Sequence, residues 1–148
     1  LLRVQWPDGM IQEKDKRENH GVAVTALALM GLASLGHQPA DKTTEGEAMR
    51  RALAFLLRPD LQLANGYFGQ KDGSRMYGHG IVTLTLTELL GMGADKAQDA
   101  LLRDRAQRAV SLILAATILT VGLAWCSTSP TGSTTRPTRS RRSCRLAS

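Results

Sequence analysis

Aromatic residues are scarce in this chain, at only 4% of its 148 residues. Single-stranded nucleic acids are usually bound by stacking their bases on aromatic rings, so this composition argues against such a surface. Cysteine is limited to Cys126 and Cys144. Two cysteines in or near the C-terminal tail form neither a disulfide framework nor a metal knuckle, and the redox compartment stays open.

Acidic residues are missing from residues 116–148, which hold five arginines. Without those arginines, residues 1–115 contain fourteen basic and thirteen acidic residues, so the net charge of +6 comes mainly from the tail. Because this charge does not belong to a folded face, we expect no nucleic-acid partner. The hydrophobic fraction of 43% argues against full-length disorder, and the length suits one ordinary domain.

A basic-then-apolar leader is also missing after Leu1, so we expect no signal peptide, and the localisation stays unknown. The longest apolar run, residues 109–125, is near the lower length limit for a membrane span and contains Ser111, Thr117 and Thr120. Since this run begins inside an amphipathic pattern, membrane contact is a hypothesis that the sequence does not favour.

Short segments recur at nearly one spacing, which predicts a repeat of about 57 residues and is typical of solenoids and toroids. The recurring pairs are Leu1-Leu2-Arg3 with Leu56-Leu57-Arg58, His20-Gly21-Val22 with His79-Gly80-Ile81, and Arg51-Ala52-Leu53 with Arg108-Ala109-Val110, at offsets of 55, 59 and 57.

Each repeat is expected to hold two different helices. Residues 20–35 are apolar almost all round, so the first helix needs cover on several sides. Residues 45–57 are apolar on one side only, and Thr43 or Thr44 can cap this second helix.

The second copy repeats this contrast. Residues 81–90 are mostly apolar, and residues 96–114 are amphipathic. The alternation from Thr83 to Thr87 is typical of a strand, but we predict a helix because the counterpart after His20 is helical by pattern. Apolar helices covered by one-sided helices give an all-α fold with inner and outer layers. Closed into a ring, such layers form an α/α toroid, here a partial one.

Residues 65–69 and 76–84 carry a family resemblance. The segments Asn65-Gly66-Tyr67-Phe68-Gly69 and Met76-Tyr77-Gly78-His79-Gly80-Ile81-Val82-Thr83-Leu84 resemble the prenyltransferase and squalene-oxidase repeat. That repeat builds squalene–hopene cyclases, protein prenyltransferase β subunits and bacterial toroid proteins of unknown activity. The resemblance covers about residues 1–115 and implies a terpenoid cyclase-like α/α toroid.

Repeats of this family often carry a glutamine before the glycine–aromatic turn, where it braces neighbouring helical hairpins. Gln62 with Gly66 matches this pattern, with Phe68 in place of tryptophan. Gln5 with Gly9 is a poorer first copy, because Met10 and Ile11 stand where an aromatic is expected.

The catalytic motifs of the family are not found in this chain. Squalene–hopene cyclases use an Asp-x-Asp-Asp cluster, protein prenyltransferases bind zinc through Asp, Cys and His, and toroidal lanthionine cyclases use Cys, Cys and His. No Asp-x-Asp-Asp cluster occurs in the sequence, and neither zinc set can be assembled, since both cysteines lie outside the matching region. We therefore assign no metal, cofactor or catalytic residue, and whether the chain is an enzyme stays uncertain.

Five residues are candidates for ligand binding. His20 and His79 each begin an expected inner helix, near one rim of a toroid cavity, where histidine can contact a ligand or transfer a proton. The alternative is that each histidine bonds a loop carbonyl. Tyr67, Phe68 and Tyr77 can line a cavity mouth or serve only in packing.

The chain divides into a partial toroid domain, residues 1–115, and an irregular tail rich in Ser, Thr and Arg, residues 116–148. One interpretation of the tail is a basic disordered segment. The second is out-of-frame translation, because at the repeat offset Gly122 to Trp125 is a poor copy of the glycine–aromatic turn.

Two function hypotheses follow. The first is a fragment of a prenyltransferase- or squalene-cyclase-like repeat protein, non-catalytic as it stands, that acts as a scaffold or binds an apolar, isoprenoid-like ligand or a protein partner. The alternative is a fragment of a terpene cyclase or prenyltransferase whose catalytic residues lie in missing repeats.

Overall fold

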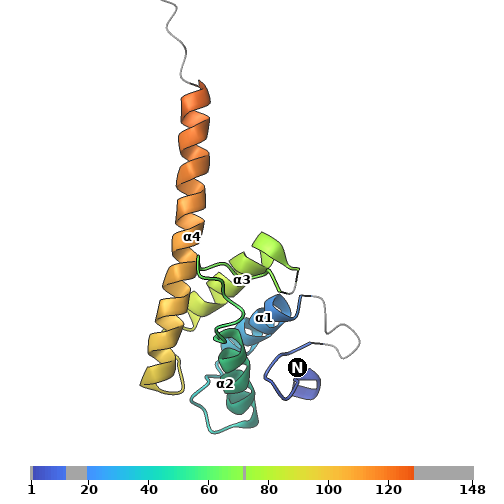
Figure 1. The fold of residues 1–148 in the computed structure, drawn as a ribbon. Helices are drawn as coiled ribbons and strands as arrows, with labels where there is room; N and C mark the ends of the chain where they lie inside the picture. The colour runs from blue at the N-terminus through green and yellow to red at the C-terminus, as the bar shows by residue number, and fades with distance from the viewer. Residues whose placement is uncertain (1, 13–19, 72, 129–148) are drawn as a thin grey trace, which may run out of the picture.

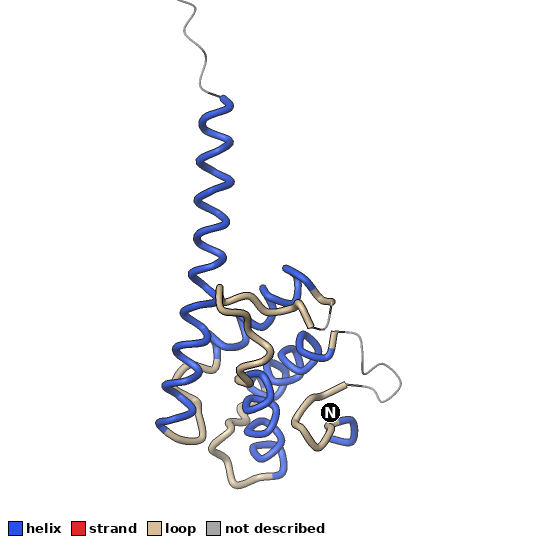
Figure 2. The backbone as a smooth tube through the Cα atoms, in the orientation of Figure 1, coloured by secondary structure: helices blue, strands red, loops and turns tan. Residues whose placement is uncertain are grey.

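The computed structural model describes residues 2–12, 20–71 and 73–128, and the main secondary structure in these ranges is α-helical (Figure 1). Within these ranges Figure 2 shows helices joined by loops, and the single β-bridge pairs Gln5 with Ile11. The predicted all-α class is therefore confirmed. The elements are a short 3-10 helix η1 (Leu2–Val4), and the α-helices α1 (Gly21–Ser34), α2 (Thr44–Leu56), α3 (Arg75–Glu88) and α4 (Lys96–Thr128).

Two helical hairpins, α1–α2 and α3–α4, lie side by side. Helix α1 packs against both α2 and α3, and α3 packs against α4. The two central helices are thus α1 and α3, each covered by the helix that follows it in the chain (Figure 1). This order agrees with the predicted alternation of apolar inner helices and one-sided outer helices.

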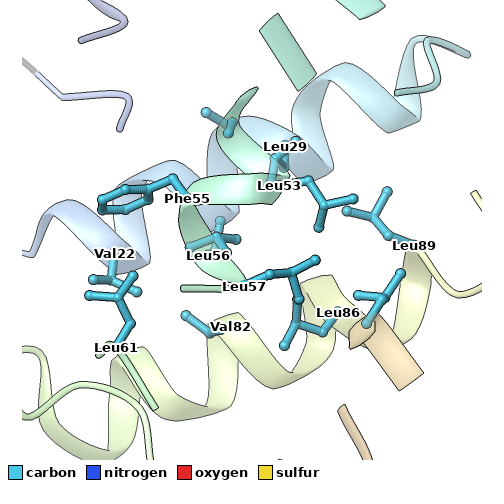
Figure 3. Packing of buried hydrophobic residues seen from close by; sticks show 14 of the residues in the cluster. Val22, Leu29, Leu53, Phe55, Leu56, Leu57, Leu61, Val82, Leu86 and Leu89 are labelled. Carbon is cyan, nitrogen blue, oxygen red and sulfur yellow. The ribbon is translucent and has the colours of Figure 1, made fainter. Parts of the chain in front are cut away.

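The hydrophobic core lies where α1, α2 and α3 meet. In Figure 3 side chains from all three helices point toward one another. Leu29, Leu53, Leu56 and Leu86 are completely buried there. Burying side chains of this size supplies about 1.5–3 kcal/mol each, which makes this junction the main source of stability.

The first hairpin follows its sequence pattern closely. The apolar stretch 20–35 forms α1, and the one-sided stretch 45–57 forms α2. Thr43 caps α2, because its hydroxyl oxygen accepts a hydrogen bond from the Gly46 N–H at 3.1 Å. Helix α1 is not covered all round, since Val24 and Leu27 are 38% and 50% exposed.

Helix α3 begins earlier than expected, and this corrects the placement of His79. The helix starts at Arg75, so His79 lies inside its second turn, whereas His20 directly precedes α1. The threonines that suggested a strand are helical, and their hydroxyls bond back to carbonyls of the preceding turn. Thr83 donates to the His79 carbonyl at 2.7 Å, and Thr85 to the Ile81 carbonyl at 2.9 Å.

Helix α4 is longer than the expected 96–114 and continues to Thr128. Residues 116–128, expected to belong to an irregular tail, are therefore helical. Figure 1 shows this end of α4 projecting beyond the other helices. The rest of the expected tail, residues 129–148, lies outside the described residues.

Two glycines allow the turns before the inner helices to approach the outer helices. Gly9 and Gly66 have φ of 94° and 91°, a region that other residues rarely adopt. A Cβ at Gly9 would overlap the carbonyl oxygen of Arg51 in α2, and a Cβ at Gly66 would overlap that of Arg108 in α4. The two contacts are 57 positions apart in the sequence, which is the predicted repeat.

Replacing Gly66 by alanine is expected to destabilise the fold by at least about 1–3 kcal/mol, because both the backbone strain and the overlap must be relieved. Urea unfolding followed by circular dichroism measures this loss. Gly31→Ala is the matched control, since Gly31 lies in α1 with no atom within 4 Å of an added Cβ. It should be neutral or stabilising by up to about 1 kcal/mol. Equal effects from both variants would contradict this account of Gly66.

Candidate functional site

The turn between the two hairpins, residues 62–69, holds two of the five candidate residues, Tyr67 and Phe68. Its backbone is closed by hydrogen bonds from Leu63 N–H to the Tyr67 carbonyl and from Gly66 N–H to the Leu63 carbonyl, both 2.9 Å. The side-chain oxygen of Asn65 accepts from Tyr67 N–H at 3.1 Å, which is the turn-forming role that Asn favours.

Gln62 ties this turn to α4. Its side-chain Nε2 donates to the carbonyls of Gly66 and Arg105, both at 3.0 Å. Its Oε1 accepts from Nη1 of Arg105 at 3.2 Å. Gln62 and Arg105 are 5% and 9% exposed, so these bonds satisfy polar groups that water cannot reach easily.

Gln5 makes the same two contacts in the first hairpin. Its Nε2 donates to the Gly9 carbonyl at 3.2 Å and to the Ala48 carbonyl in α2 at 2.9 Å. Each residue of this set lies 57 positions before its counterpart around Gln62. The contacts are those of a structural brace between a turn and the outer helix that covers it.

His79 is buried against the same turn. Its Nδ1 accepts a hydrogen bond from the Phe68 N–H at 3.2 Å, so the neutral ring carries its proton on Nε2. Nε2 is buried and makes no hydrogen bond of good geometry within the described part of the chain. Burial lowers the pKa of His79, and an interaction with the Ala109 backbone opposes this shift only partly. The site therefore favours a neutral histidine.

Three of the five candidate residues come together, and two do not. The rings of Tyr67 and Phe68 lie 5.4 Å and 6.3 Å from the His79 ring, between centroids. Phe68 and His79 are completely buried, so their cluster is a packed unit. Tyr77 is 77% exposed on α3, and His20 is exposed before α1.

Thr25 occupies the place in α1 that His79 occupies in α3, and the sequence reading missed this. Its hydroxyl oxygen accepts from the Ile11 N–H at 2.9 Å, as His79 accepts from Phe68. Ile11 and Phe68 differ by 57 positions, but Thr25 and His79 differ by 54, because the second connection to the inner helix is shorter. The offset of 54 also relates the bounds of α1 and α3. The sequence analysis also did not predict Arg105 as the partner of Gln62. The offset of 57 could have identified it, because Arg105 lies 57 positions after Ala48, the partner of Gln5.

Hollows occur away from this cluster. One of about 260 Å³ lies at the carboxyl ends of the inner helices, lined by Met30, Ala33, Ser34, Glu88 and Met92. Another of about 560 Å³ lies beside the start of α2, and its lining includes Lys42, Glu47, Arg50 and Asp95. Within the described ranges, no group of three His, Cys, Asp or Glu side chains is placed to hold a metal ion.

The end of α4 is apolar and uncovered. The side chains of Leu114, Ile118, Leu119, Val121 and Leu123 are 57–71% exposed. Among the helices described, α4 is the one long and apolar enough to cross a bilayer, over Lys96–Leu123. An apolar helix covered by further protein has the same composition, so this feature does not by itself assign the chain to a membrane.

No protein-family model, curated protein or solved structure matches the chain, so the family resemblance rests on its residues and motifs alone.

Removing the amide of Gln62 should destabilise the second hairpin more than the equivalent change destabilises the first. In Gln62→Leu the carbonyls of Gly66 and Arg105 lose a donor in a buried place, at a cost of about 1–3 kcal/mol for each unsatisfied group. Gln5→Leu is the matched control, because Gln5 is only half-buried and its loss is partly replaced by water. The midpoints of urea unfolding compare the two. A larger loss in Gln5→Leu would contradict the brace as described.

The stability of the fold should fall as the pH drops below about 6.5, the ordinary value for histidine. Because burial lowers the pKa of His79 in the folded chain, the unfolded chain takes up a proton at position 79 at a higher pH than the folded chain does. His79→Asn keeps an acceptor for Phe68 N–H and should remove this pH dependence, measured by urea unfolding between pH 7.5 and 5. His20→Asn is the control and should retain it. An unchanged pH profile in His79→Asn would rule out His79 as its source.

Proposed function

We propose that the chain is part of a prenyltransferase- or squalene-cyclase-like repeat protein of the α/α-toroid type. In this proposal the two hairpins are non-catalytic and serve as a scaffold that presents an apolar face to an isoprenoid-like ligand. The observation that carries the proposal is the repeated glutamine brace, Gln5 on α2 and Gln62 on α4, at the spacing of the sequence repeat.

The arrangement of the helices supports a partial ring. Inner helices α1 and α3 pack on each other, and each is covered by its own outer helix. Two hairpins cannot close a ring, and repeat architectures generally need three or more units to bury a continuous core. Further repeats in a complete protein would cover the sides that α1, α3 and α4 leave open.

The proposed ligand face is built from equivalent positions of the inner helices. Leu27 of α1 is 50% exposed, and its counterpart 54 positions on, Ile81 of α3, is half-buried. In a toroid of this type, the inner helices line the central space. Apolar side chains there, without a nearby charged cluster, suit a hydrocarbon chain better than a polar substrate.

The enzyme alternative places the catalytic residues in repeats that this chain does not contain. Within the described residues no acidic cluster or metal-binding group accompanies the apolar face. His79 is enclosed by Phe68 and Tyr67 and offers no open proton-transfer position. These observations favour the scaffold and binding role for the described hairpins.

Titration of geranylgeraniol into the protein, followed by isothermal calorimetry, tests the proposed binding. Saturable binding is expected in the unmodified chain. It should weaken by about tenfold or more in Leu27→Glu, because a carboxylate is placed on the apolar face. Leu101→Glu is the matched control, since Leu101 is a similarly exposed leucine on α4, at 40%.

The outcomes separate the parts of the proposal. Absence of saturable binding, or equal loss in Leu27→Glu and Leu101→Glu, would overturn the ligand role at this face. Conversion of geranylgeranyl diphosphate or squalene by the purified chain, followed by mass spectrometry of the products, would overturn the non-catalytic assignment.

A further inference from the structure

The last part of α4, residues 109–128, contains no charged residue, and we call it the uncharged segment. The charged residues of the helix end at Arg108, and the next charged residue in the sequence is Arg136. The helix continues to Thr128, beyond the amphipathic part that made the sequence disfavour a membrane span. A helix of about 20 residues rises about 30 Å, which matches the hydrocarbon thickness of a bilayer. The length of the uncharged segment therefore suits a membrane span.

The exposed apolar side chains of the uncharged segment lie on roughly opposite sides of the helix. Because successive residues of a helix turn by about 100°, Leu114 and Ile118 share one side, whereas Leu119 and Leu123 share the other. All of these side chains are 57–71% exposed within the described part of the chain. Figure 1 shows this end of α4 projecting beyond the other helices, so the two hairpins cover neither side.

A further repeat would cover only one side of an outer helix. In the two hairpins the outer helices keep a polar outer side, where α2 exposes Glu47 and Arg50 and the first half of α4 exposes Arg103. A repeat packed on the side of Leu114 would leave Leu119 in water. A bilayer, by contrast, surrounds a helix with hydrocarbon on every side, which is what an apolar residue pattern all round the helix favours.

Two threonines near the middle of the uncharged segment bond to the helix itself. The Thr117 hydroxyl donates to the Ile113 carbonyl, and the Thr120 hydroxyl donates to the Thr117 carbonyl, both at 2.9 Å. Hydrocarbon offers no hydrogen bonds, so polar groups inside a bilayer must be satisfied within the protein. Both threonines are exposed and still meet this requirement.

We propose that residues 109–128 are a membrane anchor that inserts across a lipid bilayer, with the two hairpins at its surface. Ala109, at the start of the segment, is completely buried, so the hairpins would lie directly on the membrane. The five arginines that follow the segment, between residues 136 and 145, supply charge that complements anionic lipid headgroups. This anchor does not require the ligand-binding role proposed above.

Flotation with vesicles of phosphatidylcholine and phosphatidylglycerol tests the anchor, after reconstitution of the full chain from detergent. The unmodified chain should float with the vesicles in a density gradient. It should remain with them in high salt and in alkaline carbonate, because salt screens charge interactions but does not release a buried apolar segment.

Ile118 and Leu119 are neighbours at the middle of the uncharged segment, so they lie at the same depth but on different sides. Ile118→Lys and Leu119→Lys should each lower the ratio of bound to free protein by about tenfold or more, and to a similar extent, because a charge at the bilayer centre is costly on either side. Leu101→Lys is the matched control, since Leu101 is 40% exposed in the charged half of α4. It should float like the unmodified chain.

Three results would overturn the proposal. The first is an unmodified chain that does not float, and the second is its release by high salt, which would indicate adsorption through the arginines alone. The third is a loss in Ile118→Lys with none in Leu119→Lys, which would place a protein partner on one side of α4. Circular dichroism checks that each variant is folded, and Ala116→Lys replaces Leu119→Lys on the same side if that variant unfolds. None of these results bears on geranylgeraniol binding, which Leu27→Glu tests separately.

Discussion

The hydrogen bonds of two glutamine amides hold this structure in register. An amide group can donate two N–H bonds, and Gln5 and Gln62 each use theirs on one carbonyl of a turn and one carbonyl of an outer helix. These bonds fix the distance between the turn and the helix that covers it. The glycine of each turn then lies against the same outer helix, and the residue two positions on can bond the inner helix. The position of each inner helix therefore follows from a side chain outside it.

Much of this arrangement could be predicted because it is repeated in the sequence. The one-sided pattern of α2, a cap at Thr43 or Thr44 and the 57-residue offset of the glutamines were all visible in the sequence. The helix bounds of the first hairpin agreed within one residue, and Thr43 is the cap. The alternating threonines of α3 looked like a strand. Only the comparison with the first copy favoured a helix there, and the hydroxyl bonds to preceding carbonyls explain how the helix tolerates them.

The histidines show why the candidate site was less predictable. His20 and His79 share a local motif, His-Gly followed by an aliphatic residue, but the inner helices are related by 54 positions and the motif by 59. A connection that is three residues shorter shifts the matches within the inner helices, although the outer helices are again related by 57 positions. No local pattern reveals which residues of the inner helices fill the same place. The true counterpart of His79 is a threonine, since both accept a hydrogen bond from a turn N–H. This position requires a hydrogen-bond acceptor for the turn N–H. Both threonine and histidine supply one, so finding one residue type in the first copy does not predict the other in the second.

The long end of α4 follows from the same repeat logic. In the first hairpin, Leu57 and Leu61 follow the outer helix and are buried in the core that both hairpins share. Their counterparts 57 positions on, Leu114 and Ile118, are exposed, because nothing among the described residues packs on them. The sequence carries the apolar residues but lacks a glutamine and glycine at the positions matching Gln62 and Gly66, so the chain continues as a helix where a turn would be expected.

Identical braces have a consequence for any array built from such hairpins. Each inner helix is held in the same way, so each has a side that faces the next inner helix. In the last helix of an array, this side has no neighbouring helix to pack against. Repeat proteins usually protect these ends with capping repeats that have a polar outer face. Here the exposed residues Val24 and Leu84 are apolar, so the two ends of the inner layer lack the polar face that a capping repeat supplies.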